Sequence, residues 1–63
     1  MNKYQVQFMM QQLEYIKEEA RATRGTLSMY EAVRILIHER YERHILSKDE
    51  RDYLLHEITV AQL

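Results

Sequence analysis

Residues 4–20 read YQVQFMMQQLEYIKEEA, and this stretch carries two apolar patterns that decide the fold. The first recurs at alternating steps of three and four residues, the heptad seam of a helix packed against other helices: Val6, Met9, Leu13, Ile16 and Ala20. The second lies roughly 140° away around the helix, at about 100° per residue, and consists of Tyr4, Phe8 and Tyr15. One pattern can face the later helices of the same chain. We therefore expect the other to face a partner.

Helix boundaries are marked by few but clear signals, because the chain has no proline and a single glycine, Gly25. Gly25 follows a basic segment and predicts the end of a first helix over about residues 3–24. Ser28 and Glu31 match a capping box and predict a second helix over about 28–46. Ser47 and Glu50 repeat the box and predict a third over about 47–61.

Both later helices carry an apolar stripe that can cover the first one. The second helix presents a broad face made of Met29, Val33, Leu36, Ile37, Tyr41 and His44. The third presents Leu54, Leu55, Ile58 and Ala61. The joint at 45–47 is too short for anything but an antiparallel hairpin or a steep crossing. Residues 1–63 are thus predicted to form one all-α domain, a long N-terminal helix followed by a helical hairpin or bent helix pair, in a dimeric bundle.

Size and composition favour self-association. At 63 residues, folding buries only about 60% of the surface that the unfolded chain exposes. Cysteine is absent, so neither a disulfide nor a thiolate zinc site can stabilise the fold. Oligomerisation is the remaining way to stabilise so small a domain. No run approaches the roughly 18 apolar residues of a membrane span. We expect a soluble, cytoplasmic homodimer, of a size typical of bacterial or bacteriophage regulators.

The residue types needed for catalysis do not form a site. The segment from His38 to Glu42 resembles a zinc-binding H-E-x-x-H helix, but Glu42 stands where the second histidine belongs. His44 points roughly 120° away from His38 around the helix, so the geometry disfavours a metal site here. Ser28 and Ser47 are accounted for as helix caps. We expect no enzyme activity, no metal and no cofactor.

Nucleic-acid binding is the alternative function, because three short helices with a tight joint are the layout of a dimeric helix-turn-helix regulator. The recognition helix would begin with Asp49, Glu50 and Asp52, which repel phosphates. A basic set exists, but it is interleaved with glutamates and the net charge is −1. Its members are Arg21, Arg24, Arg34, Arg40 and Arg43. DNA is therefore possible but disfavoured.

Recognition of another protein is the function that the residues favour. Through Leu13 the only ionisable side chains are Lys3 and Tyr4, and glutamines surround the apolar positions. Aromatic and methionine side chains suit recognition of a partner, and glutamine costs less to desolvate than a charge. The predicted protein interface is Tyr4, Phe8, Met10, Tyr15 and Ile35. We expect a small regulatory protein that inhibits or modulates a cellular protein by masking its working surface; a structural subunit of a larger assembly is a further possibility.

Overall fold

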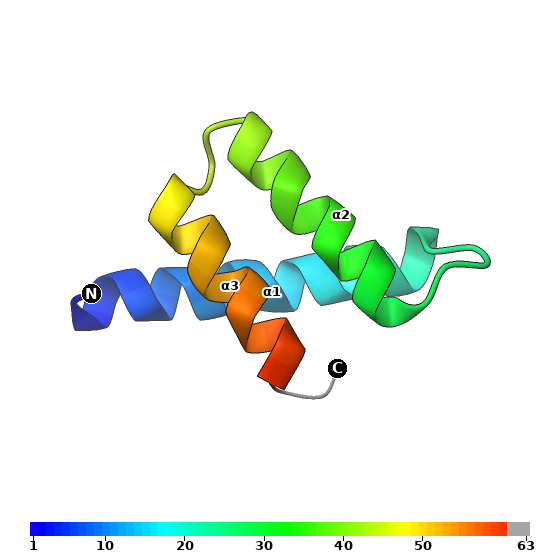
Figure 1. Ribbon diagram of the computed structural model, residues 1–63, viewed down its shortest axis with the longest axis horizontal. Coiled ribbons are helices and arrows are strands. Elements are labelled where there is room, and N and C mark those ends of the chain that lie inside the picture. Colours follow the sequence, from blue (N-terminus) through cyan, green and yellow to red (C-terminus); the bar gives the residue numbers. More distant parts are fainter. Residues whose placement is uncertain (61–63) are drawn as a thin grey trace.

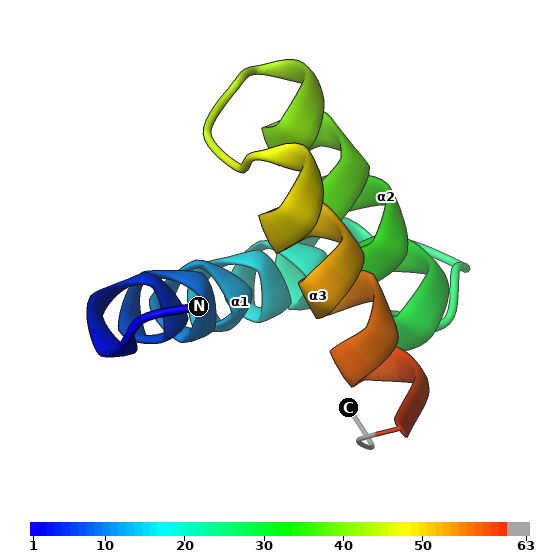
Figure 2. The ribbon, with the colours of Figure 1, turned by 60° about the vertical axis from the view of Figure 1, so that its left-hand side comes forward.

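The computed structural model describes residues 1–60 and contains three α-helices in that range: α1 (Lys3–Thr23), α2 (Met29–Glu42) and α3 (Lys48–Val60). The expectation of an all-helical, three-helix fold is confirmed. α2 and α3 lie side by side with opposite chain directions, joined by a short turn, and both cross α1 (Figure 1). The N-terminal end of α1 projects beyond both of them (Figure 2). The expected end of the third helix at Ala61 lies outside the described residues.

The core lies where the three helices meet, and it uses the heptad seam of α1. Met9, Ile16 and Ala20 are fully buried there. α2 and α3 supply the other side of the core through Ala32, Val33, Leu36, Ile37, Leu54 and Ile58, and the connecting turn adds Leu46. The inward-facing pattern of the first helix is therefore the seam, with Val6 partly buried at its end. The aromatic pattern is left on the outside.

Asn2 and Gly25 define the two ends of α1. The Asn2 side chain accepts a hydrogen bond from the Gln5 amide at 2.8 Å, which satisfies one of the free N–H groups of the first turn. At the other end Gly25 has φ of +58°, a left-handed conformation that stops the helix after Thr23. The chain then turns back so that α2 can pack on the seam.

The two serine caps differ in detail. At α2 the Ser28 Oγ accepts from the Glu31 amide at 3.1 Å, but the Glu31 carboxylate accepts from Arg34 at 3.0 Å. At α3 both halves of the capping box are present: Ser47 N–H donates to Glu50 Oε1 at 2.8 Å, and Glu50 N–H donates to Ser47 Oγ at 3.2 Å. Glu50 Oε2 also accepts from the Gln5 side chain at 3.3 Å, which ties the start of α3 to α1.

The second helix ends at Glu42, four residues before the end at about 46 that the sequence predicted. His44 has φ of +61°, and its N–H donates to the Tyr41 carbonyl at 3.0 Å, while Ile45 N–H donates to the Arg40 carbonyl at 2.9 Å. These two bonds form a Schellman motif, which normally places glycine at the left-handed position. The early end brings Leu46 into the core at 2% exposure. His44, expected on the apolar face of a longer helix, is exposed instead.

Replacing His44 by glycine should stabilise the fold by about 1 kcal/mol, because a side chain disfavours the left-handed conformation that glycine adopts freely. Thermal unfolding of His44→Gly at a fixed protein concentration measures this effect. His38→Gly is the matched control: His38 lies inside α2 and is exposed, so the same substitution there should destabilise the fold by roughly 0.3–0.5 kcal/mol. An unfolding midpoint for His44→Gly below that of the wild type would contradict a left-handed conformation at residue 44.

Candidate interaction surface

One side of α1 carries exposed aromatic side chains, and we call it the outer face: Tyr4, Phe8, Gln11 and Tyr15. Tyr4 is 78% exposed, Tyr15 is 49% exposed and Phe8 is 37% exposed. The Gln11 side-chain amide donates to the Tyr15 hydroxyl at 3.1 Å, which holds two members of the face together. Their spacing of three and four residues places all four on one side of a helix, roughly opposite the core seam.

The outer face is uncovered because α2 and α3 both pack on the opposite side of α1 (Figures 1 and 2). The molecule measures 36 Å along its longest axis. At about 1.5 Å per residue the 21-residue α1 spans most of that length. The face is therefore a long ridge along the molecule. Aromatic side chains on such a surface contribute large contact areas to binding and lose little conformational freedom.

Met10 and Ile35, the other two residues of the predicted interface, are exposed but do not join the outer face. Met10 lies roughly 140° around α1 from the Tyr4, Phe8 and Tyr15 line. Ile35 lies on the side of α2 that points away from the core residues Val33 and Leu36. The structure thus brings together three of the five predicted residues and leaves the other two as separate apolar positions.

Two further exposed apolar side chains lie near the start of α2, and sequence periodicity did not assign either to the interface. Leu27 is in the loop after Gly25, where no helical repeat exists to place a side chain. Tyr30 is at the second position of α2, on the edge of its apolar stripe. The exposure of Leu27 could be recognised only once the loop had a conformation.

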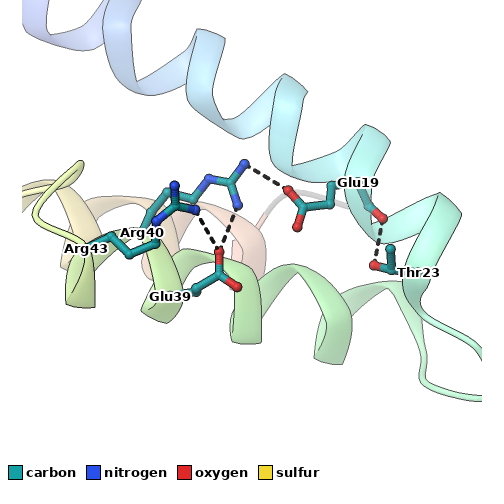
Figure 3. Close-up of polar contacts among 5 residues, drawn as sticks. All are labelled: Glu19, Thr23, Glu39, Arg40 and Arg43. Carbon is teal, nitrogen blue, oxygen red and sulfur yellow. Dashed lines mark hydrogen bonds and ion pairs between the residues drawn. The ribbon is translucent and has the colours of Figure 1, made fainter.

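Arg40 joins α1 to α2 through an ion-pair cluster (Figure 3). Its guanidinium lies 3.0 Å from the Glu19 carboxylate of α1 and 3.5 Å from Glu39, which also pairs with Arg43 at 3.3 Å. The Arg40 side chain is only 12% exposed, whereas that of Arg43 is 62% exposed. The Thr23 hydroxyl donates to the Glu19 carbonyl at 2.8 Å at the same end of α1. Arg40 is therefore part of the packing between the helices, whereas the sequence placed it only in the basic set considered for DNA contact.

Other arginines are also engaged within the chain. Arg34 pairs with Glu31 at 3.0 Å, and this hydrogen bond raises the pKa of Arg34. Arg51 pairs with Asp52 at 2.8 Å, which raises the pKa of Arg51, and stacks over the Tyr41 ring at 4.3 Å from its centroid. Three of the five residues in the basic set proposed for DNA contact, Arg34, Arg40 and Arg43, thus have carboxylate partners.

The titratable residues do not gather into a reactive centre within residues 1–60. No group of three or more His, Cys, Asp or Glu residues in that range could hold a metal ion, and no pocket is found there. His38, the first residue of the zinc-like segment, is exposed on α2, as is Glu42. The Glu57 carboxylate nearby raises the pKa of Tyr53 on α3. Over the same part of the chain, no helix is both long enough and apolar enough to span a membrane.

Comparison with protein-family models, characterised proteins and solved structures finds no match to this chain.

Proposed function

We propose that this chain is a small regulatory protein that binds another protein through the outer face of α1 and inhibits or modulates it by masking its working surface. The observation that supports the proposal is the exposure of Tyr4, Phe8 and Tyr15 on the outer face, although the seam on the other side of the same helix packs in the core. Residues 4–13 contain no charged side chain, so little charge has to be desolvated when this part of the outer face is covered.

The proposal includes a cytoplasmic, homodimeric free form in a bacterial or bacteriophage setting. The absence of cysteine suits a reducing compartment. A second copy can cover the aromatic ridge when no other partner is present. Binding of a second copy and binding of a target have the same physical reason, because burial of apolar area is the main driving force of association.

The helix-turn-helix alternative has less support from the residue contacts. The arginines on α2 neutralise carboxylates of the same chain, and Asp49 and Glu50 occupy the first turn of α3, where a recognition helix would meet phosphates. Salt dependence separates the two functions. A DNA complex would lose affinity steeply between about 50 and 200 mM salt, whereas a contact through the outer face should be nearly insensitive.

The experiment that tests the proposal places a photo-crosslinking phenylalanine analogue at Phe8 and captures partners from a bacterial lysate. We expect one protein to be captured by the wild-type chain, to crosslink at position 8, and to be lost with Phe8→Glu. His56 of α3 is exposed and provides the control: His56→Glu should retain the partner, and an analogue at position 56 should not crosslink to it.

Two results would contradict the proposal. Capture that is unaffected by Phe8→Glu would show that the outer face is not the contact surface. Crosslinking at position 8 to nothing except a second copy of the chain would show that the face serves self-association alone.

A further inference from the structure

The outer face carries opposite charges at its two ends. Lys3 lies at its start, and Glu14 and Glu18 lie at its other end, with no charged side chain between residues 4 and 13. At about 100° per residue these three side chains lie along the same edge of the face. The face is thus polarised along the helix axis, positive at the N-terminal end and negative toward the C-terminal end.

The terminal charges of this edge are not used inside the chain. Within residues 1–60, neither Lys3 nor Glu18 forms an ion pair, whereas Glu14 lies 3.8 Å from Lys17. Both residues are exposed. They are therefore available to a partner whose charges run in the opposite direction.

We infer that the occupant of the outer face is a second copy of this chain, packed antiparallel along α1 about a two-fold axis between Phe8 and Gln11. In this register Tyr4 of each copy lies opposite Tyr15 of the other, and Phe8 lies opposite Gln11. Each edge of an antiparallel helix pair meets the same edge of its partner, so Lys3 of each copy approaches Glu18 of the other. The two-fold axis produces this charge contact twice.

Charge decides between the two possible directions. In a parallel pair in register Lys3 and Glu18 would remain about 22 Å apart along the helix axis, so the opposite charges of the two copies could not pair. Only the antiparallel pair brings each Lys3 near the Glu18 of the other copy. Its apolar part extends from Tyr4 to Tyr15, roughly 17 Å of helix, so the interface is smaller than the about 1,200 Å² of a stable complex and the dimer is weak.

This pairing deepens the proposed function and rests on it only for the choice of face. Because the second copy and the target use the same aromatic side chains, dimerisation and target binding exclude each other. The dimer is then a stored form in which the contact surface is covered.

Sedimentation of the full chain from about 1 µM to 1 mM at low salt tests the pairing, since weak complexes require high concentration. We expect a monomer–dimer equilibrium for the wild type. Lys3→Glu and Glu18→Lys should each weaken the dimer by about tenfold, because each turns two attractions into two repulsions. The double variant carrying both reversals should return to within about threefold of the wild type, because the swapped pairs attract again.

Matched controls make the same charge changes elsewhere on the surface. Lys48→Glu changes the charge in the first turn of α3, as Lys3→Glu does in the first turn of α1. Glu42→Lys changes the charge of an exposed side chain at the end of α2. Both variants should leave the dimer unchanged. Circular dichroism checks that every variant keeps its helicity. A wild type that is monomeric at all concentrations, or single reversals without effect, would overturn the pairing, and loss of lysate capture would leave it standing.

Discussion

Leu54→Ala should remove about 3 kcal/mol from the free energy of unfolding, because it deletes buried methyl groups and leaves a cavity between α3 and the other helices. Leu54 is fully buried, and only one other residue of α3, Ile58, is buried with it. A domain of this size has roughly 3–9 kcal/mol of stability in total. The substitution therefore costs a third or more of what holds the fold together.

Thermal unfolding by circular dichroism, at one protein concentration for all variants, measures the loss. A change of about 3 kcal/mol corresponds to a midpoint roughly 12–24 °C lower for a small domain. Val60→Ala is the control, because Val60 is on the same helix but 64% exposed, and it should change the midpoint little. Equal effects of the two variants would show that α3 does not pack through Leu54.

Arg40→Ala should cost about 2 kcal/mol, which is large for a charged residue. The side chain is nearly buried between α1 and α2, so its removal deletes both the packing of its stem and the ion pair with Glu19. Arg43→Ala removes an arginine bound to the same Glu39, but from an exposed position, and should cost less than about 0.5 kcal/mol. Urea unfolding of the two variants gives a direct comparison.

A double-mutant cycle with Glu19→Ala separates the two parts of the Arg40 effect. If the ion pair matters, the loss in the double variant should be smaller than the sum of the single losses. Arg40→Lys should recover only part of the stability, because a single ammonium cannot reproduce the fork that contacts both carboxylates. Identical costs for Arg40→Ala and Arg43→Ala would contradict a structural role for Arg40.

Local sequence signals predicted most of the fold because they act over a few residues. The three-and-four spacing of Met9, Leu13 and Ile16 is enough to place them on one side of a helix, and that side is the core. Gly25 and the serines at positions 28 and 47 act on the nearest turn of backbone, so their positions indicated where helices begin and end.

The end of α2 could not be predicted in this way. Histidine adopts the left-handed conformation far less often than glycine does, so His44 did not mark a helix end as Gly25 did. The chain reverses there because Leu46 is buried in a core that α1 and α3 also build. The free energy gained by burying Leu46 depends on residues far away in the sequence, so the residues next to position 44 could not predict it.

The role of Arg40 could be predicted only in part, because the spacing of α2 indicated its burial but not its partner. It follows Leu36 by four residues and Val33 by seven, which places it on the apolar side of α2. A charge on that side requires a partner, but the identity of the partner, Glu19, depends on how α2 crosses α1. The spacing could indicate that Arg40 is buried. Only the way α2 crosses α1 decides that the Glu19 carboxylate lies beside it.

The sequence by itself determined three helices, most of their ends and the two faces of α1, because periodicity and capping are properties of neighbouring residues. Tertiary structure decided which exposed residues share a surface. Tyr4, Phe8 and Tyr15 remain together on an uncovered face because α2 and α3 both pack on the other side of α1, and the same packing places Ile35 of α2 apart from them. Met10 is separated from them by its own position around α1. A surface shared between helices exists only after the helices have been placed against one another.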